Sequence, residues 1–132
     1  MALKKQVISM SDPRPQQEGQ AVPLSPAVKA GDFVFVSGQT PRDPKTGEFV
    51  VGDIQAQTRQ VLENVKAVLE AAGSSMEKVV KATVYCSNSG YFNKVNEVYR
   101  QYFPSEPPAR TFVTVGSWPG AFDIEIECIA IA

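Results

Sequence analysis

Chemistry in this sequence must come from an arginine, two glutamates and a few small polar residues, because the chain of 132 residues contains no histidine. The absence of histidine excludes Ser-His and Cys-His nucleophile systems and histidine-based metal sites. Cys86 and Cys128 show no metal-binding or redox spacing, and we expect both to be small core residues. Any reaction therefore depends on Arg, Glu, Asp, Lys, hydroxyls, backbone groups and water.

Arg110 lies in the stretch PPARTFVTV, residues 107–115, where two prolines precede a run of β-formers. Its neighbours Pro108 and Phe112 give it partly apolar surroundings. A guanidinium is a planar fork that binds a carboxylate through two hydrogen bonds without losing its proton, and partial desolvation strengthens that interaction. The pattern favours a carboxylate-binding arginine; the alternative is a surface salt bridge.

Glu125 and Glu127 alternate with apolar residues near the C-terminus, in DIEIECIAIA, residues 123–132. A partly buried glutamate can order or activate a water molecule, and burial raises its pKa into a range suited to proton transfer. The alternative for this pair is an ion pair between strands or between subunits.

Three further polar positions are candidates for a binding site. Ser37 and Gly38 follow an apolar run, where glycine lets a ligand approach the backbone and serine offers a hydroxyl. An ordinary exit from a strand into a turn explains the same pattern. Asn96 lies within an apolar-patterned helix, and its alternative role is that of a helix-surface amide.

The composition indicates one domain spanning residues 1–132. Apolar residues make up 43% and charged residues 20%, both close to globular averages. The net charge of −1 and the lack of a basic cluster disfavour nucleic-acid binding. The sequence shows no signal-peptide core and no apolar run of membrane-spanning length. We expect a cytoplasmic protein with reduced thiols and no membrane partner.

Hydrophobic periodicity and turn residues define the expected elements. A helix should start after Asp53 and end near Gly73, because apolar residues recur at three- and four-residue steps between them. FVFV, residues 33–36, is typical of a strand covered on both faces. The full expected set is a strand in 4–9, an irregular segment at 11–26, a hairpin at 27–38, a helix at 54–72, a strand at 78–86, a helix at 91–103, and strands at 110–115 and 122–132.

This order predicts an α+β fold in which two helices pack on one face of a mixed six-stranded sheet. The last strand alternates: one side carries Ile124, Ile126, Cys128 and Ala130, and the other carries Glu125, Glu127, Ile129 and Ile131. Since neither side is wholly polar, we expect the second face of the sheet to meet another subunit.

Several stretches together resemble the Rid family of reactive-intermediate deaminases, also called the YjgF or L-PSP family. They are VSGQTPRDPKTGE, VLENVKAVLEAAG, VVKATVY, FNKVNEVYRQYF, PPAR and DIEIECIAIA, in unbroken order from about residue 27 to the C-terminus. The resemblance implies a chorismate-mutase-like α+β fold. It also implies a homotrimer with a central barrel and clefts between subunits.

The resemblance further implies hydrolysis of small 2-imino or enamine acids to 2-oxo acids and ammonia, without metal or cofactor. Arg110 matches the arginine that binds the substrate carboxylate, and Glu125 matches the glutamate that positions the attacking water. Other matching positions near the cleft are Ser37, Gly38, Asn96, the backbone of Phe112, and Pro119, with Lys81 matching a lysine of less defined role.

The sequence departs from the best-known branch of that family at Leu24. That branch carries Gly-Pro-Tyr here, with the tyrosine lining the pocket, whereas this chain has VPLSPAV. The preferred substrate is therefore expected to be larger or different, and a related branch that lacks the tyrosine acts on 2-aminomuconate-type enamines. The alternatives are a non-catalytic trimer, either a binder of small carboxylates or a scaffold without activity, and an endoribonuclease. The acidic balance and missing histidine disfavour the last.

Overall fold

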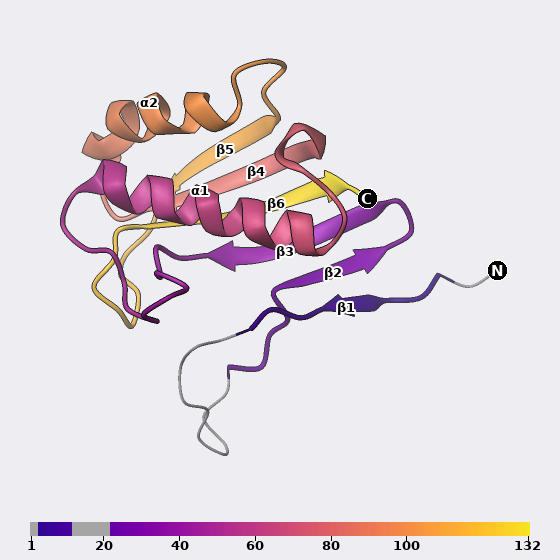
Figure 1. The fold of residues 1–132 in the computed structure, drawn as a ribbon. Coiled ribbons are helices and arrows are strands. Elements are labelled where there is room, and N and C mark those ends of the chain that lie inside the picture. Colours follow the sequence, from indigo (N-terminus) through magenta and orange to yellow (C-terminus); the bar gives the residue numbers. More distant parts are fainter. Residues whose placement is uncertain (1–2, 12–21) are drawn as a thin grey trace.

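The computed structural model describes residues 3–11 and 22–132 (Figure 1). Most of the irregular segment expected at 11–26 therefore lies outside the described residues. The strands are β1 (Gln6–Ile8), β2 (Ala27–Ala30), β3 (Phe33–Gln39), β4 (Val79–Cys86), β5 (Ala109–Thr114) and β6 (Ile124–Ile131). The α-helices are α1 (Ile54–Ala71) and α2 (Phe92–Tyr102), and the 3-10 helices are η1 (Met76–Lys78) and η2 (Ser89–Tyr91).

The strands form one six-stranded sheet in the order β1-β2-β3-β6-β4-β5. Neighbouring strands are antiparallel except β4 and β5, which are parallel and joined by the crossover helix α2. Both helices lie on the same face of the sheet (Figure 1). The predicted mixed sheet with two helices on one face is confirmed.

Helix α1 covers the middle of the sheet, and its ends follow from local chemistry. The Asp53 carboxylate accepts a hydrogen bond from the Gln55 N–H at 2.9 Å and caps the first turn. Gly73 has φ +80°, the left-handed conformation that ends a helix without strain when the residue is glycine. The buried stripe of α1 consists of Ile54, Gln57, Thr58, Val61, Leu62, Val65, Val68 and Leu69.

The apolar residues Phe92, Val95, Tyr99, Tyr102 and Phe103 predict one buried face for helix α2, and the structure differs from this pattern at Val98 and Phe92. Val98 is fully buried, whereas Phe92 is 42% exposed and packs edge-on against Phe112. Phe92 is the first helical residue, so its side chain reaches past the core to the outer strand β5. Both cysteines are buried and unpaired, as the sequence predicted.

Strand β6 lies at the centre of the sheet and separates two kinds of surface. Ile124, Ile126, Cys128 and Ala130 are buried beneath the helices, and the intervening residues point to the opposite face, as the alternation predicted. On that opposite face Phe33 and Phe35 are each 45% exposed, although Val34 and Val36 are buried. The chain therefore covers FVFV on one side only, and the expected second cover does not come from its described residues.

A buried polar network fixes the chain just before β6. The fully buried Gln57 side chain donates to the Asp123 carboxylate at 3.0 Å and accepts from the Asp123 N–H at 2.8 Å. The other carboxylate oxygen of Asp123 accepts from the Ser87 hydroxyl at 2.8 Å. Because every one of these groups has a partner, the network costs little to bury and sets the position of the β6 residues that follow.

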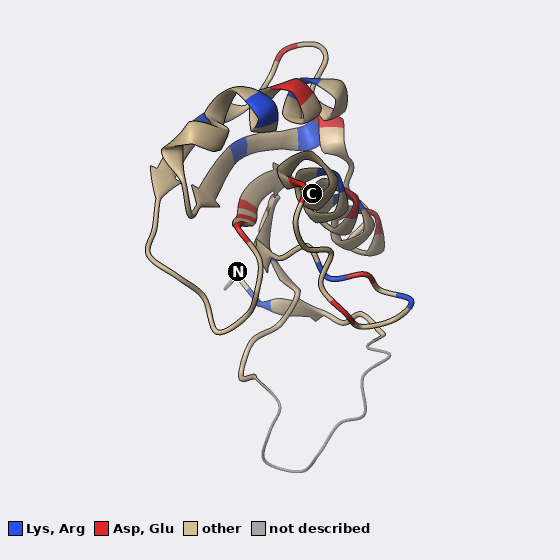
Figure 2. Cartoon of the chain, turned by 90° about the vertical axis from the view of Figure 1, so that its left-hand side faces the viewer, with Lys and Arg blue, Asp and Glu red and all other residues tan. Residues whose placement is uncertain are grey.

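Charged residues of both signs are interspersed on the surface. Blue and red segments alternate along α1 and α2 in Figure 2 rather than forming a stripe of one sign. No helix of the described residues is long and apolar enough to cross a membrane.

Candidate active site

The register of the sheet places the two principal candidates on opposite faces. Arg110 pairs with Ala82, whose side chain is buried beneath the helices, so Arg110 also points to the helix side. Glu125 pairs with Tyr85 and points to the open side. A single chain therefore does not bring Arg110 and Glu125 into one pocket, and each has to be described with its own neighbours.

Arg110 lies on the edge strand β5, and helix α2 supplies its immediate surroundings. Its Nη1 donates to the Asn96 side-chain oxygen at 2.7 Å. The guanidinium carbon lies 4.7 Å from the centre of the Tyr99 ring and 5.6 Å from that of Phe92. The structure thus brings the two sequence candidates Arg110 and Asn96 together and adds an aromatic surface that sequence reasoning missed.

A hollow of about 660 Å³ opens beside this guanidinium. Its lining consists of Asn96, Tyr99, Arg100, Phe103, Pro104, Pro107, Pro108 and Arg110. Asn96 occupies one N–H of Arg110, and none of the described residues pairs a carboxylate with it. The rest of the planar fork can therefore bind a carboxylate from outside the chain.

Phe112 lies on the same face of β5 as Arg110, two residues along. Its ring meets that of Phe92 edge-on at 5.1 Å between centres. The Phe92 ring of this pair lies 5.6 Å from the Arg110 guanidinium carbon. An apolar neighbour at this distance lowers the local dielectric constant, which strengthens charge-assisted hydrogen bonds to the guanidinium.

Glu125 lies on the open face against the end of β3. A Cβ built on Gly38 would meet the Glu125 Oε2 at 2.5 Å, so the absence of a side chain at residue 38 makes room for this carboxylate. Gly38 was expected to let a ligand approach the backbone, but within one chain that space belongs to Glu125. The Ser37 hydroxyl donates to the Ser25 carbonyl at 2.6 Å and fastens the end of β3 to the segment before β2.

The electrostatics of the open face centre on three groups. Burial raises the pKa of Glu125, and the nearby Glu127 carboxylate raises it further. The Tyr85 hydroxyl donates to Glu127, and this hydrogen bond is the main reason that the pKa of Tyr85 is raised. Lys81 donates to the Thr111 hydroxyl at 2.8 Å instead of to either glutamate. Glu125 is thus the carboxyl group on this face whose pKa lies above its ordinary value, the direction that suits a group taking part in proton transfer.

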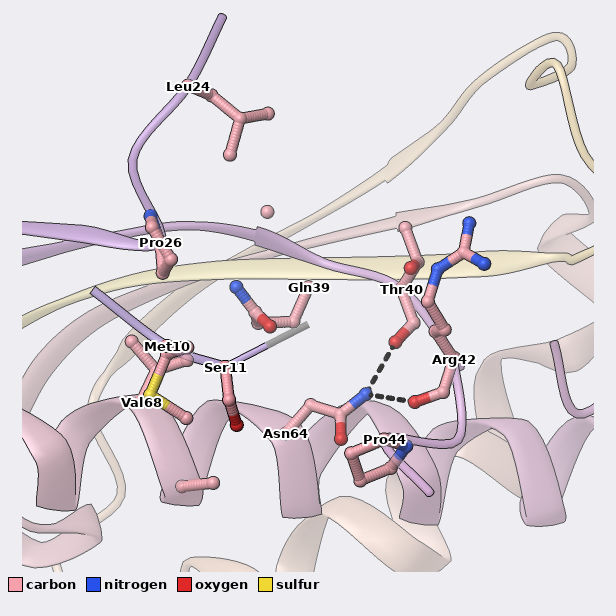
Figure 3. Close-up of a pocket in the computed structure, with 12 residues that line it drawn as sticks. Met10, Ser11, Leu24, Pro26, Gln39, Thr40, Arg42, Pro44, Asn64 and Val68 are labelled. Carbon is pink, nitrogen blue, oxygen red and sulfur yellow. Dashed lines mark hydrogen bonds between the residues drawn. The ribbon is translucent and has the colours of Figure 1, made fainter. Parts of the chain in front are cut away.

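Leu24 borders a separate cavity of about 270 Å³ between α1 and the segment after β3 (Figure 3). Gly38 also borders this cavity, whereas Glu125 does not. The Asn64 amide fixes one wall by donating to the Thr40 and Arg42 carbonyls at 2.9 and 2.8 Å. Leu24 is 62% exposed, so it offers an apolar surface at the position where the best-known branch of the family has a tyrosine.

Pro119 lies in the loop between β5 and β6, and it lines neither of these two hollows. Trp118 beside it stacks on Phe122 with 4.9 Å between ring centres. Within one chain the loop is held by this aromatic contact, and Pro119 itself is exposed.

Two residues that sequence reasoning missed, Tyr99 and Tyr85, contact the candidate residues directly. Tyr99 follows Asn96 by three positions on α2, a spacing that places both on one helix face. Tyr85 lies opposite Glu125 in the β4–β6 ladder. The three-residue spacing of Asn96 and Tyr99 can be read from the sequence. The pairing of Tyr85 with Glu125 cannot, because it depends on which strands become neighbours. Among the described residues, no group of three or more His, Cys, Asp or Glu side chains could hold a metal ion.

Comparison with known proteins identifies the class to which this fold and site belong. The family model described as Endoribonuclease L-PSP matches residues 15–132. The chain belongs to this family, which confirms the resemblance inferred from its motifs.

Individual relatives agree with that assignment. The chain is 57% identical over 108 residues to a RutC family protein of Pyrococcus horikoshii, covering 82% of this chain and 86% of the relative. It is 41% identical over 129 residues to the chloroplastic Reactive Intermediate Deaminase A of Arabidopsis thaliana, covering 98% of this chain and 67% of the relative. The solved structure of Escherichia coli TdcF with bound serine has a TM-score of 0.85 and 38% identity, covering 96% of this chain and 98% of that one.

The close fit of Glu125 against Gly38 leads to a first prediction. In Gly38→Ala the new methyl group displaces the Glu125 carboxylate towards solvent, because the end of a flexible side chain yields more easily than backbone. We expect the pKa of Glu125 to fall towards its ordinary value, with a stability change within about 1 kcal/mol. Carbon-13 NMR titration of the carboxyl group and thermal unfolding measure the two effects.

Gly116→Ala is the matched control, because a Cβ at residue 116 meets nothing within 4 Å. It should leave the titration of Glu125 unchanged. An identical Glu125 titration in Gly38→Ala and the native protein would show that the carboxylate does not rest against residue 38.

Proposed function

We propose that this protein is a deaminase that hydrolyses small 2-imino and enamine acids to 2-oxo acids and ammonia. The observation that carries the proposal is the Arg110 guanidinium, held by Asn96 and aromatic rings beside a hollow, with donors left for a carboxylate. The relative named Reactive Intermediate Deaminase A supports the reaction class. The TdcF structure with bound serine supports a small amino-acid-like ligand, because serine carries a carboxylate and an amino group on one carbon.

We further propose that the site is completed between subunits of a homotrimer with a chorismate-mutase-like arrangement and a central barrel. Arg110 and Glu125 face opposite sides of one sheet, and the open side exposes apolar residues that residues 3–11 and 22–132 leave uncovered. In the proposed trimer the open faces meet, and the Arg110 half of one subunit joins the Glu125 half of its neighbour. This arrangement would cover the apolar residues of the open face. It would also bring a Glu125 carboxylate next to each Arg110 guanidinium.

The proposed reaction divides the work between the two halves. An enamine first tautomerises to the imine. Arg110 binds the carboxylate and fixes the imine carbon, and Glu125 positions a water molecule and accepts its proton as the oxygen attacks that carbon. Glu125 returns this proton to the nitrogen, so the tetrahedral adduct carries an amine and a hydroxyl group. The hydroxyl proton then passes through Glu125 to the amine nitrogen, the C=O bond forms as the C–N bond breaks, and ammonia leaves the 2-oxo acid. Proton transfer by Glu125 contributes roughly 10²-fold or more.

The other assigned positions shape this cleft in the proposal. Gly38 leaves room for the Glu125 carboxylate, and Ser37 fixes the end of β3 beside it. Phe112 and Leu24 provide apolar surface. With leucine at residue 24, the preferred acid is larger than 2-aminoacrylate or different from it, and a 2-aminomuconate-type enamine is the alternative substrate. Pro119 reaches the cleft only from a neighbouring subunit.

The family description includes endoribonuclease, and this activity is less favoured for the present chain. Its net charge is −1 and it has no histidine. Basic and acidic residues are interspersed along both helices (Figure 2). This charge distribution does not favour a basic groove that would bind RNA phosphates. Without histidine, the chain also lacks the usual acid–base pair for RNA cleavage. The binder of small carboxylates that lacks turnover is the second candidate, favoured by the leucine at residue 24.

Removal of the carboxylate-binding group tests the proposed activity. A dehydratase or an amino-acid oxidase generates 2-aminoacrylate or other imino acids in situ, and ammonia release is followed above the spontaneous rate. Arg110→Ala should lower kcat/KM about 10- to 100-fold, because a charge-assisted interaction with the substrate is lost. Arg59→Ala is the control, since Arg59 is an exposed arginine on α1 that donates to Gln101. Equal losses in both variants would exclude the assigned role, and oxo-acid binding without turnover in the native protein would favour the non-catalytic binder.

The raised pKa of Glu125 leads to a pH prediction. Only the ionised carboxylate accepts a proton from water, so the rate should fall as pH decreases through the Glu125 pKa, above the ordinary carboxyl range. In Glu127→Gln the neighbouring negative charge is lost, the pKa of Glu125 decreases, and the acid limb of kcat against pH should move to lower pH. An unmoved limb in Glu127→Gln, or the same limb in Glu125→Gln, would contradict the role of Glu125.

The proposed trimer predicts a solution mass of three 14.3-kDa chains by sedimentation or light scattering. Phe35→Glu should shift this mass towards the monomer and abolish imine hydrolysis, because a carboxylate replaces an apolar contact on the open face. Val51→Glu, at a loop residue that is 57% exposed, is the matched control and should remain trimeric. A monomeric native protein with full activity would exclude the intersubunit site.

A further inference from the structure

The side chains of Asn96, Phe92 and Tyr99 contact the Arg110 guanidinium, and Tyr99 is the most buried of them. Its side chain is 6% exposed, and the guanidinium carbon lies 4.7 Å from its ring centre. The buried Phe103 ring packs against the Tyr99 ring, with 4.7 Å between the ring centres. The ring on which the guanidinium rests is therefore itself fixed by the core.

The hydroxyl of Tyr99 does not take part in this contact. It is fully buried, and it has no hydrogen-bond partner among the described residues. Burial raises the pKa of Tyr99 to about 12, so the group stays protonated at physiological pH. A hydroxyl in this position neither reaches the hollow nor exchanges protons readily, and the ring face remains as the functional part of the side chain.

We propose that Tyr99 is a positioning residue that fixes the plane of the Arg110 guanidinium through its ring, while its hydroxyl is dispensable. This deepens the proposed function and rests on it, because the fork has a role only if a carboxylate binds there. The Asn96 amide accepts a hydrogen bond from Nη1, and the guanidinium carbon lies over the Tyr99 ring, 4.7 Å from its centre. These two contacts restrict the long, flexible arginine chain to one orientation, so less rotamer freedom is lost when the substrate binds.

Three single variants separate the ring, the hydroxyl and general packing. Tyr99→Phe keeps the ring and removes the hydroxyl that has no partner. Tyr99→Leu keeps an apolar side chain in the core and removes the ring face. Tyr102→Leu is the matched control, a half-buried tyrosine on the same helix without a recorded contact to Arg110.

The direct measurement is the Arg110 Nε–Hε signal in an arginine-labelled NMR spectrum, assigned by its loss in Arg110→Lys. A proton held over an aromatic ring is shifted upfield. The shift should persist in Tyr99→Phe and Tyr102→Leu and become smaller in Tyr99→Leu, where only the more distant Phe92 ring remains beside the guanidinium. An unchanged shift in Tyr99→Leu would overturn the proposal, and this readout does not depend on any enzymatic activity.

The functional measurement is KM for an imino acid, together with the Kd for 2-oxobutanoate. Tyr99→Leu should raise both about three- to tenfold with a smaller change in kcat, and Tyr99→Phe should stay within about twofold of the native protein. In an Arg110→Ala background Tyr99→Leu should weaken 2-oxobutanoate binding no further, because its effect passes through the guanidinium. An equal loss in that background would mark Tyr99 as merely structural and overturn the proposal.

The two measurements distinguish this inference from the proposed function. If the native protein neither hydrolyses imino acids nor binds 2-oxobutanoate, the proposed function fails, and the functional part of the inference fails with it. A smaller NMR shift in Tyr99→Leu would then still confirm that the ring positions the guanidinium. If the native protein is active but Tyr99→Leu behaves like Tyr102→Leu in every measurement, the proposed function stands and the inference about Tyr99 is wrong.

Discussion

Alternation along the central strand β6 is the constraint on which the molecule depends. Every second residue is buried beneath the helices, and every residue between them is turned to the opposite face. A register shift of one residue would replace Ile124 and Ile126 in the core with the carboxylates of Glu125 and Glu127. Burying unpaired carboxylates would strongly lower the free energy of unfolding. The network of Gln57, Asp123 and Ser87 sets the chain just before this strand and helps to hold the register.

The same alternation divides the chemistry of the chain into two halves. Arg110, with its amide and aromatic contacts, belongs to the helix side, and Glu125 in its niche at Gly38 belongs to the open side. Each half is well built by itself, yet neither is complete as a site for imine hydrolysis. Assembly through the open apolar face is the simplest physical way to join them, and it accounts for the exposed phenylalanines of β3 by the same contact.

The two halves also differ in how they control charge. Arg110 cannot lose its proton, so its environment acts on orientation: an amide at one edge and a ring against its face. Glu125 can gain or lose a proton, so its environment acts on pKa through burial and the neighbouring Glu127. In the proposed reaction the first group binds the substrate and the second transfers a proton, so each environment controls the property that its group would need.

The sequence by itself determined the element order, the mixed sheet with helices on one face, the caps of α1 and the alternation of β6, because these follow from local periodicity and turn chemistry. It also singled out Arg110, Asn96 and Glu125 by residue type and motif. It could not place Arg110 and Glu125 on opposite faces, give Gly38 the task of accommodating a carboxylate, or set Tyr99 beneath the guanidinium. These relations depend on which strands pair and how helices lie on them, and residues distant in the chain become neighbours only when the tertiary structure forms.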